Sequence, residues 1–422
     1  MPNPPRICLV SPSHVAANPR LVKEADALHA AGYAVHVVAG WHHPALDEHD
    51  RGIYARAKWS RTVVYGLTGP RVLLGKVRRN LARKRLADGA RPNLPLASRA
   101  IHATTHLLAA AAQRVRADLY IGHTVAGLAA AAMASKKTGG RYAFDAEDFH
   151  RAETDYAMHD RGLATAIATI ESQLLPRCAH VTAASPLIAE AYRQHYGIPL
   201  PTTVLNTFPL DEAPDPSHSV PPATRTPSLY WFSQTIGPGR GLEAWIRVLA
   251  SMNRPCDLHL RGLPAPGFVD TLEILAEETQ FKGRLQFHPP APPREMARLA
   301  SPFDLGLSLE QATPPNRDLC LTNKVFTYLL AGIPQVMTPT RAQQALAAEL
   351  GGAALVLDPG DRAGSAATLD AYLADPVAQR KARDQAWHLG QSRFNWEIER
   401  ARLLETVGRA LAGGTRRPVT AA

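Results

Sequence analysis

A glycine-rich turn between an expected strand and an expected helix is the first feature of the sequence that could bind a ligand. It spans 236–244 and reads IGPGRGLEA, and its glycines are Gly237, Gly239 and Gly241. Glycine lets the backbone come close to a phosphate group, and the helix that follows offers free N–H groups. Arg240 adds a planar cation that suits phosphate oxygens. The spacing is neither the dinucleotide motif nor a P-loop, and a tight turn alone also needs glycine, so phosphate binding is the favoured of two interpretations.

A second candidate ligand-binding segment follows the expected strand LGLSLE. It spans 321–337 and reads LTNKVFTYLLAGIPQVM, which predicts a short helix that opens at Asn323 and Lys324. The helix dipole disfavours a lysine in the first turn, and a bound anion would remove that penalty. Glu310, at the end of the preceding strand, could accept hydrogen bonds from sugar hydroxyl groups. Each residue alone also fits a solvated surface, but both are expected at the same sheet edge as Arg240, which favours a shared site.

The first half of the chain carries a separate group of ionisable residues after two expected strands. His123 ends the run DLYIGH, and the run RYAFDA leads into FDAEDFHRAE. The ionisable residues of that second segment are Asp145, Glu147, Asp148, His150 and Glu153. They could form an acid–base cluster or a divalent-metal site, because carboxylates and imidazole serve both purposes. They could also lie on a solvated helix face without any function, and the sequence leaves these alternatives open.

The pattern around these residues predicts two α/β domains that position them. The chain has 422 residues, more than one hydrophobic core usually supports. A strand at 6–12, a helix that Asn18 caps and Pro19 begins, and a strand at 34–40 form a β-α-β unit. A second alternation of strands and helices begins near residue 229. We expect a ligand cleft between the carboxyl ends of the two sheets.

The expected domain boundaries follow a change of composition near residue 208. The first domain is expected at 1–207, and a linker at 208–228 holds six prolines. The second domain is expected at 229–390. A C-terminal helix at 391–413 is expected to return to the first domain, and 414–422 reads as a disordered tail.

The composition is that of a soluble globular protein, with 45% hydrophobic and 20% charged residues. No apolar run reaches 18 residues and no signal-peptide pattern opens the chain, so we expect a cytoplasmic location. The four cysteines have no CxxC spacing, and we interpret them as core residues in a reducing compartment rather than metal ligands. The net charge of +10 favours an anionic partner such as nucleotide phosphates, nucleic acid or an anionic membrane surface.

The segment Arg71–Arg91 is far more basic than the rest of the chain, with eight Lys and Arg residues against one Asp. Its apolar residues Leu73, Val77 and Leu81 have helical spacing, which predicts a basic amphipathic helix. Docking on the anionic inner face of a membrane and a simple solvated surface both fit this pattern, and both stay open. Nucleic acid is not expected as a partner, because no aromatic residues are interleaved with the basic ones and no known nucleic-acid module is present.

These motifs, in this order, resemble the retaining glycosyltransferases of the GT-B fold, in particular the bacterial, nucleotide-sugar-dependent enzymes of the family 4 type. The resemblance runs nearly end to end, and its most specific pieces are the string NKVFTYLLAGIP at 323–334 and the turn RGLE at 240–243. It implies two Rossmann-like doubly wound domains that face each other across a cleft. It also implies transfer of a hexose from a UDP- or GDP-linked sugar to a glycan or lipid-linked acceptor in cell-surface polysaccharide or glycolipid synthesis. Such enzymes need no metal or other cofactor, because basic side chains and helix dipoles stabilise the departing diphosphate.

The resemblance also implies roles for individual residues. Arg240 matches the basic residue that neutralises the donor diphosphate, and Glu310 matches a carboxylate that contacts the donor sugar. His123 matches a histidine near the transferred sugar. The expected catalytic residues are His123, Glu310, Arg240 and Lys324. The expected donor-binding residues are Gln234, Gly237, Gly239, Arg240, Gly241, Asn323, Lys324 and Thr327. The acceptor-side candidates are Asn18, Arg20, Asp145, Glu147, Asp148 and His150.

The sequence departs from the family pattern at three places. SHVAANPR follows the first strand where many members have two glycines, and Gln234 stands where the first basic residue of a phosphate-binding pair is usual. Thr327 replaces the carboxylate that normally holds the nucleotide ribose. A hydroxyl bonds a ribose without the help of a charge, so we expect donor binding to be weaker by roughly 1–2 kcal/mol.

Two other functions therefore stay open. A GT-B epimerase or hydrolase would act on a nucleotide sugar without an acceptor, and the acid–base residues of FDAEDFH keep that alternative. A binding or partner subunit with weak or no catalysis is the other alternative, and the replacements Gln234 and Thr327 suggest it.

Overall fold

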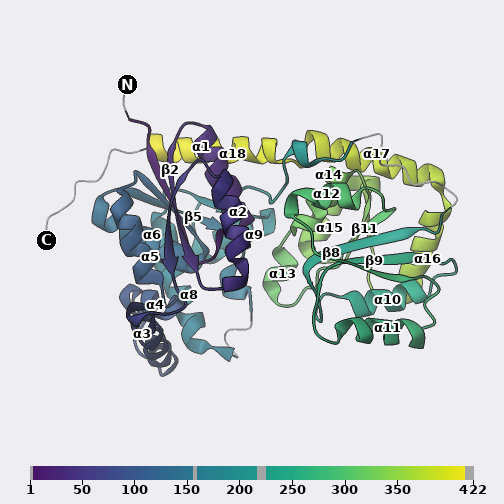
Figure 1. The fold of residues 1–422 in the computed structure, drawn as a ribbon, viewed down its shortest axis with the longest axis horizontal. Helices are drawn as coiled ribbons and strands as arrows, with labels where there is room; N and C mark the ends of the chain where they lie inside the picture. The colour runs from purple at the N-terminus through teal and green to yellow at the C-terminus, as the bar shows by residue number, and fades with distance from the viewer. Residues whose placement is uncertain (1–2, 155–158, 216–224, 414–422) are drawn as a thin grey trace. The chain divides into compact units, whose positions relative to one another are not determined.

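The computed structural model describes residues 3–154, 159–215 and 225–413. The chain divides into two compact units (Figure 1), of which unit 1 is Met1–Val204 with Arg400–Ala422 and unit 2 is Leu205–Glu399. The expected tail at 414–422 and the linker residues 216–224 lie outside the described residues. Each unit is a doubly wound parallel α/β fold, which confirms the fold class predicted from the sequence.

Unit 1 contains a parallel sheet whose described strands run in the order β3-β2-β1-β4-β5-β6-β7. The strands are β1 (Arg6–Ser11), β2 (Ala34–Trp41), β3 (Ser60–Tyr65), β4 (Leu119–His123), β5 (Arg141–Ala146), β6 (Val181–Ala183) and β7 (Thr202–Thr203). The central strands β1 and β4 are continuous apolar runs because helices cover both faces of the sheet. The strand order reverses between β1 and β4, so their carboxyl ends form a topological switch point.

The helices of unit 1 cover both faces of this sheet (Figure 1). They are α1 (Pro19–Ala30), α2 (Asp47–Arg56), α3 (Pro70–Ala87), α4 (Leu94–Ile101), α5 (Thr105–Val115), α6 (Thr124–Thr138), α8 (Arg161–Leu174) and α9 (Pro186–Tyr196), with short 3-10 turns η1 (Val15–Ala17), η2 (Pro44–Leu46), η3 (His150–Ala152) and η4 (Leu175–Arg177). Helix α1 begins where the sequence predicted, because the Asn18 side chain accepts a hydrogen bond from the Leu21 N–H at 2.9 Å. The sequence pattern does not predict β3, whose exposed position at the sheet edge leaves it without a continuous apolar run.

Unit 2 contains a second parallel sheet, whose described strands run in the order β10-β9-β8-β11-β12-β13. The strands are β8 (Ser228–Ile236), β9 (Asp257–Pro264), β10 (Leu285–His288), β11 (Leu305–Ser308), β12 (Gln335–Met337) and β13 (Ala354–Val356). The order reverses between β8 and β11, which places the switch point of this sheet at their carboxyl ends.

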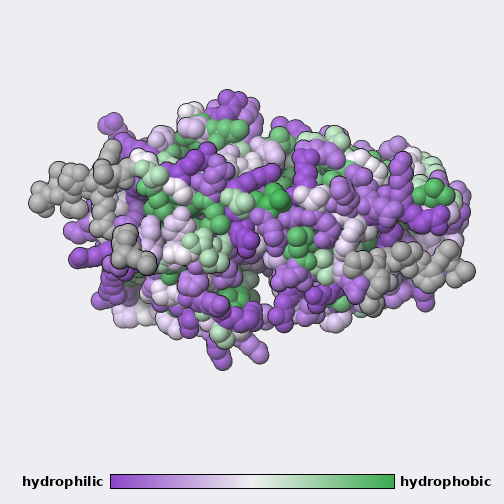
Figure 2. All heavy atoms as spheres, turned by 90° about the horizontal axis from the view of Figure 1, so that it is seen from above, coloured by the Kyte–Doolittle hydropathy of each residue, from purple (hydrophilic) through white to green (hydrophobic). Residues whose placement is uncertain are grey.

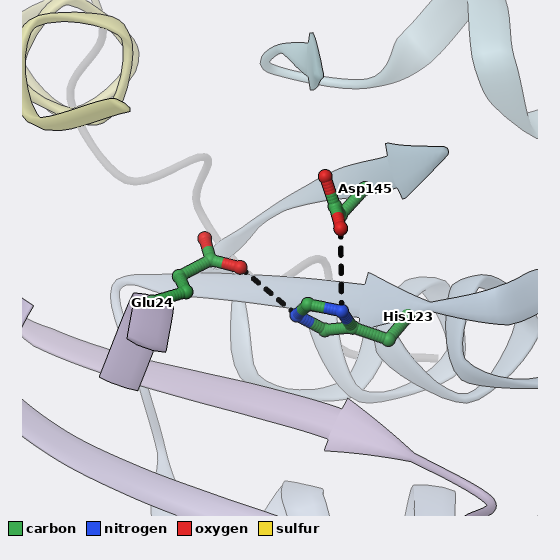
Figure 3. Close-up of side chains that lie close together, drawn as sticks. All are labelled: Glu24, His123 and Asp145. Carbon is green, nitrogen blue, oxygen red and sulfur yellow. Dashed lines mark ion pairs between the residues drawn. The ribbon is translucent and has the colours of Figure 1, made fainter. Parts of the chain in front are cut away.

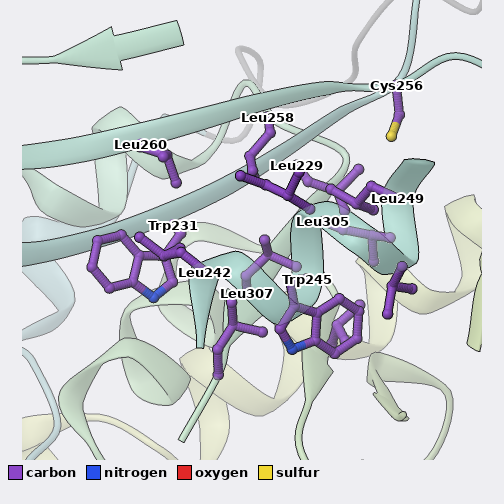
Figure 4. Packing of buried hydrophobic residues seen from close by; sticks show 14 of the residues in the cluster. Leu229, Trp231, Leu242, Trp245, Leu249, Cys256, Leu258, Leu260, Leu305 and Leu307 are labelled. Carbon is purple, nitrogen blue, oxygen red and sulfur yellow. The ribbon is translucent and has the colours of Figure 1, made fainter. Parts of the chain in front are cut away.

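The helices and 3-10 turns of unit 2 are η5 (Leu210–Glu212), α10 (Leu242–Ala250), α11 (Phe268–Glu278), η7 (Pro293–Glu295), α12 (Met296–Ala300), α13 (Pro315–Leu319), α14 (Asn323–Ala331), α15 (Arg341–Leu350), η8 (Gly351–Ala353), α16 (Arg362–Ala374) and α17 (Pro376–Ser392). One hydrophobic core lies between the sheet and α10, and Figure 4 shows Trp231 and Trp245 among leucines of β8, β9 and β11. Burial of side chains of this size contributes about 2–3 kcal/mol each relative to exposure. This core therefore fixes the two strands that carry the switch point.

The segment expected to be a linker belongs in part to unit 2. Phe208, Leu210 and Ala213 pack against a buried cluster that includes Tyr230 and Tyr328. The division into units falls between Val204 and Leu205 rather than at 207. Helix α18 (Trp396–Ala412) runs from unit 2 into unit 1, because its residues from Arg400 onward belong to unit 1.

The face of the molecule seen in Figure 2 is largely hydrophilic, with hydrophobic side chains scattered across it. No helix in the described part of the chain combines the length and the apolar character needed to cross a bilayer.

Candidate functional site

The switch point of unit 2 brings together three of the sequence-predicted residues. Strands β8 and β11 are hydrogen-bonded neighbours, so the glycine-rich turn after β8 and Glu310 after β11 leave the sheet side by side. Helix α14 follows Glu310 along the chain and begins with Asn323 and Lys324. Ligands of doubly wound sheets bind at such points, where neighbouring loops separate and open a crevice. Arg240, Glu310 and Lys324 therefore lie at one edge of this sheet, as the sequence predicted, and their role in binding stays a prediction.

The glycine-rich turn needs its glycines for backbone reasons. Gly239 and Gly241 have φ angles of 72° and 79°, in the left-handed region that side chains disfavour. A Cβ atom on Gly241 would also lie 3.3 Å from the carbonyl oxygen of Leu309, which precedes Glu310. Gly241 directly precedes the first turn of α10 without any side-chain cap, which leaves helix N–H groups available to an anion.

Arg240 is half-buried in this turn and forms no ion pair with any carboxylate of the described residues. Gly237 is buried at the start of the turn, whereas Gln234 is exposed on β8. The neighbouring Arg317 donates a hydrogen bond to the Gly239 carbonyl oxygen at 3.1 Å and so braces the turn. An arginine held beside a helix N-terminus without a carboxylate partner can bind a phosphate with two parallel hydrogen bonds.

Lys324 and Glu310 form a close ion pair that the sequence did not reveal. The Lys324 Nζ atom lies 2.8 Å from Glu310 Oε1, and the two side chains are 10% and 14% exposed. Lys324 also lies over the Trp231 ring, at 5.9 Å from its centre. Burial by itself would raise the pKa of Glu310, but the charge of Lys324 outweighs it and lowers that pKa. The helix dipole disfavours the charge of Lys324 in the first turn of α14, and the Glu310 carboxylate offsets that cost. The sequence pattern predicted a bound anion in that role.

The Thr327 hydroxyl is bonded within its own helix, and its contact with a ribose stays a prediction. Thr327 is 1% exposed, and its hydroxyl donates a hydrogen bond to the Asn323 carbonyl oxygen at 3.0 Å, one turn earlier in α14. Threonine readily forms this bond inside a helix, because its hydroxyl reaches the carbonyl four residues back. The hydroxyl proton is therefore not directed at a ribose. Asn323 itself is exposed at the helix start.

The switch point of unit 1 holds a buried group of charged residues, which Figure 3 shows in part. His123 at the end of β4 lies opposite Asp145 of β5 in the sheet register. The His123 Nε2 atom is 2.9 Å from Glu24 Oε2, and its Nδ1 atom is 3.4 Å from Asp145 Oδ2. The three side chains come from α1, β4 and β5 and are at most 4% exposed. The group therefore joins helix α1 to strands β4 and β5.

Arg20 completes this group on the other side of Asp145. Its guanidinium donates two hydrogen bonds to the Asp145 carboxylate, at 2.6 and 2.8 Å, and a third to the Val204 carbonyl oxygen at 2.6 Å. The Thr182 hydroxyl donates to the same carboxylate at 2.6 Å. Burial alone would raise the pKa of Asp145, but Arg20 outweighs burial and holds that pKa well below its ordinary range. Asp145 is thus a carboxylate anion with all of its main acceptor positions filled.

The surroundings of His123 favour its charged form. Burial alone would lower the pKa of His123, but its contact with Glu24 and the charge of Asp145 outweigh burial and raise that pKa. The two ring nitrogens of His123 lie near the carboxylates of Glu24 and Asp145, although neither contact has the geometry of a hydrogen bond. With a residue exposure of 1%, His123 has the contacts of a residue that positions the strand ends, and its predicted contact with a sugar stays untested.

The ring and carboxylate atoms of Glu24, His123 and Asp145 are close enough together to hold a metal ion. The neighbouring guanidinium of Arg20 argues against such a site, because it already binds both Asp145 oxygens and would repel a cation. A proton on His123 fits this donor set better than a divalent ion does.

The ionisable side chains of FDAEDFH bond to two different sets of partners. Asp145 bonds to Arg20 and lies beside His123, whereas the His150 Nδ1 atom lies 3.1 Å from the Tyr192 hydroxyl. That hydroxyl also donates to Glu171 Oε1 at 2.9 Å, and burial raises the pKa of Glu171 to about 7. Between the two groups, Glu147 is half-buried, and burial raises its pKa. Asp148 contributes its carbonyl oxygen to the Tyr192 hydroxyl at 3.1 Å.

A histidine holds the loop that lacks the expected glycines. The His14 Nδ1 atom lies 2.7 Å from Asp50 Oδ2, and its Nε2 atom accepts hydrogen bonds from the backbone N–H groups of His42 and His43 at 2.9 and 2.8 Å. His14 is fully buried. These bonds tie the loop after β1 to the loop after β2, beside the switch point. This pairing cannot be predicted from the sequence, because its members lie 28 to 36 residues apart.

Glu24 is the residue at this site that the sequence could have identified. It lies three positions after Leu21 on the apolar face of α1, and an acid on a buried helix face needs a partner. Thr182 and Glu171 had no comparable signal, because each is a single polar residue in a mixed segment.

Comparison with solved structures identifies the architecture. The chain superposes on sucrose-phosphate synthase from Thermosynechococcus elongatus with a TM-score of 0.71 and 15% identity, over 97% of this chain and 100% of that one. It superposes on HepE from Anabaena, solved with UDP and glucose, with a TM-score of 0.68 and 16% identity, over 96% and 99%. The lipopolysaccharide outer core galactosyltransferase WaaB gives a TM-score of 0.63 and 12% identity, over 96% and 99%.

Sequence comparison adds no assignment, since no protein-family model and no curated protein matches the chain. The structural likeness extends over both units and both sheets, and the strand orders are those of two doubly wound domains. The chain therefore has the GT-B fold of these glycosyltransferases.

Proposed function

We propose that this protein is a retaining hexosyltransferase that moves a sugar from a UDP- or GDP-linked donor to a glycan or lipid-linked acceptor. The observation that carries the proposal is the group at the switch point of unit 2. There, Arg240 lies in the glycine-rich turn without a carboxylate partner among the described residues, and the Lys324–Glu310 ion pair follows the neighbouring strand. A nucleoside diphosphate sugar offers the matching chemistry, since it joins a doubly charged diphosphate to a polyhydroxylated ring. HepE, which shares the fold, was crystallised with UDP-glucose.

In the proposed reaction, charge develops on the diphosphate as the glycosidic bond to the donor breaks. Arg240, Lys324 and the free N–H groups of α10 would stabilise that charge, and preorganised donors of this kind lower a barrier by several kcal/mol. Glu310 would keep Lys324 in place and accept a hydrogen bond from a sugar hydroxyl with its second oxygen. These cations can take the part that a metal ion plays in other transferases, so the proposal includes no metal.

The acceptor would bind to unit 1 at the switch point between β1 and β4. His123 and Arg20 hold the strand ends there, and the half-buried Glu147 is the acid best able to meet an acceptor hydroxyl. A role in cell-surface polysaccharide or glycolipid synthesis follows from the family resemblance and from the nature of the neighbour WaaB.

The test compares Arg240→Ala with a matched control, Arg247→Ala, which removes an exposed arginine from the same helix region. A thermal-shift panel of UDP- and GDP-sugars first identifies the donor, since a bound ligand raises the melting temperature. With that donor, we expect Arg240→Ala to lose about 100-fold or more of transfer or donor-hydrolysis rate, while the control stays within about twofold. NMR of the product anomer reports retention. Near-normal turnover by Arg240→Ala, or an inverted product, would contradict the proposal.

A donor-binding partner subunit with little catalysis is the second candidate, and the buried Thr327 hydroxyl favours it. This candidate predicts a thermal shift with a nucleotide sugar but no turnover with any acceptor extract. The epimerase or hydrolase alternative would use the acid–base residues of FDAEDFH, and it predicts epimerised or hydrolysed nucleotide sugar in an assay without any acceptor.

A further inference from the structure

Helix α3 presents an apolar surface that nothing in the described part of the chain covers. Among the described residues, six of the twelve exposed large hydrophobic side chains lie between residues 65 and 81. They are Tyr65 at 65%, Leu67 at 39%, Leu73 at 57%, Leu74 at 47%, Val77 at 55% and Leu81 at 58% exposure. Scattered exposed leucines are ordinary, but half of the total within one short segment is a concentrated patch.

The patch is a continuous stripe along the outer face of α3. Successive residues of a helix turn about 100°, so Leu73, Val77, Leu81 and Leu74 lie within an arc of about 100°. The buried residues Val72, Ala82 and Leu86 lie on roughly the opposite side. The helix is therefore apolar on two faces, and unit 1 uses only one of them.

Helix α3 is firmly attached through its buried face, so the outer stripe is a fixed surface. Arg83 donates hydrogen bonds to the carbonyl oxygens of Ala100 and Ile101 at 2.8 and 3.1 Å and to the Asp160 carboxylate at 2.8 Å. Gly75 allows close approach, because a Cβ atom there would lie 2.3 Å from the Ala103 carbonyl oxygen. In Figure 1, α3 lies at the lower end of unit 1 beside α4.

Positive charge borders the stripe. Arg71, Arg78 and Arg85 are exposed at seven-residue intervals and line one side of it, and the exposed Lys84 lies within it. Across the whole segment 66–91, Asp88 is the single acidic residue. A protein partner would need an apolar face bordered by many acidic residues to match this surface. An anionic bilayer supplies an apolar interior and negatively charged headgroups together.

We propose that α3 and the preceding loop dock unit 1 on an anionic lipid surface. Leu73, Val77 and Leu81 would enter the boundary between headgroups and acyl chains, and the flanking arginines would bind lipid phosphates. The helix lies in the plane of the surface and does not cross the bilayer. None of the stripe residues is among those placed at either switch point, and the proposal does not depend on glycosyl transfer, because binding is measured without any donor.

The test is co-sedimentation of the full chain with vesicles of phosphatidylcholine containing 30% phosphatidylserine, and with pure phosphatidylcholine. We expect binding to be at least about tenfold weaker to the neutral vesicles and to fall as salt rises. The variant Leu73→Gln/Val77→Gln/Leu81→Gln should bind at least about tenfold more weakly. The variant Arg71→Gln/Arg78→Gln/Arg85→Gln should lose about 100-fold, since each surface cation contributes about fivefold.

The matched control is Leu263→Gln/Ile274→Gln/Val377→Gln, which alters three side chains of unit 2 that are 63%, 55% and 63% exposed. It should bind within about twofold of the unchanged chain. Circular dichroism verifies the folding of every variant, and all substituted residues are at the surface. Undiminished binding of the stripe variant, equal binding to neutral vesicles, or loss of binding in the control would overturn the proposal. So would a concentration-dependent dimer in sedimentation velocity that the stripe variant abolishes, because a second copy would then be the occupant.

Discussion

The Lys324–Glu310 ion pair offers the sharpest quantitative test of the site in unit 2. The change Lys324→Met keeps the length and apolar body of the side chain over Trp231 and removes its charge. Glu310 then stays in a position that is 14% exposed without its partner at 2.8 Å. Breaking a buried pair from one side costs about 3–5 kcal/mol, and the slight exposure places the expected loss near the lower end, about 3 kcal/mol.

The loss should depend on pH in a defined direction. In the unchanged protein, Lys324 holds the folded-state pKa of Glu310 below its ordinary value of 4.5. The pair therefore contributes stability that is present above pH 4.5 and is lost as the pH falls through the lowered pKa. Without Lys324, burial raises the pKa of Glu310. Glu310 of the variant is therefore protonated as the pH falls, and the loss of its uncompensated charge restores part of the variant's stability. The difference between the two proteins should be largest near pH 8 and shrink toward pH 4.

Differential scanning calorimetry at pH 8, 6 and 4.5 measures this directly. For a unit of this size, about 3 kcal/mol corresponds to a melting temperature lower by about 6–12 °C at pH 8. The double variant Lys324→Met/Glu310→Gln should recover most of that loss, because it removes the uncompensated charge. A loss below about 1 °C, a loss that is independent of pH, or no recovery in the double variant would refute the reasoning.

The other predictions concern the buried residues of both units. Arg20→Met leaves the Asp145 carboxylate without its two short hydrogen bonds, and urea unfolding of unit 1 should show a loss of about 3–5 kcal/mol that Asp145→Asn in the same chain partly restores. His123 has a raised folded-state pKa, so its contribution to folding stability is present below its unfolded pKa of about 6.5 and is lost as the pH rises through the folded value. In a profile of stability against pH, His123→Gln should therefore reduce the fall in stability over that range. An unchanged profile would contradict this prediction. Thr327→Val should change donor affinity by less than about twofold in calorimetric titration, because the hydroxyl is committed to Asn323; a tenfold loss would instead mean that it binds the ribose.

The local signals of the sequence predicted most of the scaffold. Helix α1 begins after the Asn18 cap, and α14 ends at Gly332, whose φ of 68° requires glycine. The central strands appear as apolar runs because both of their faces are buried. Edge elements such as β3 were not predicted, since a strand with one exposed side and few partners has little of that pattern.

The sequence also located the candidate site residues at the correct sheet edge, because the carboxyl end of a parallel strand is fixed by the chain direction. The sequence did not show which of these residues form ion pairs with one another. Glu310 meets Lys324 across 14 residues, and Arg20 meets Asp145 across 125, so only the folded sheet brings these charges within hydrogen-bond distance. For Thr327, the sequence shows that a hydroxyl replaces an acid, but it does not show where that hydroxyl is directed.

Composition and short-range periodicity by themselves determined that this chain folds as two parallel α/β units with a basic helix and a glycine-rich turn. These properties depend on neighbours within one or two helical turns or one strand. Only the tertiary structure decided that His123 lies buried between two carboxylates and that Lys324 already has an anion beside it. It also decided that the leucines of α3 face outward, because a helix with two apolar stripes can bury either one until its neighbours are in place.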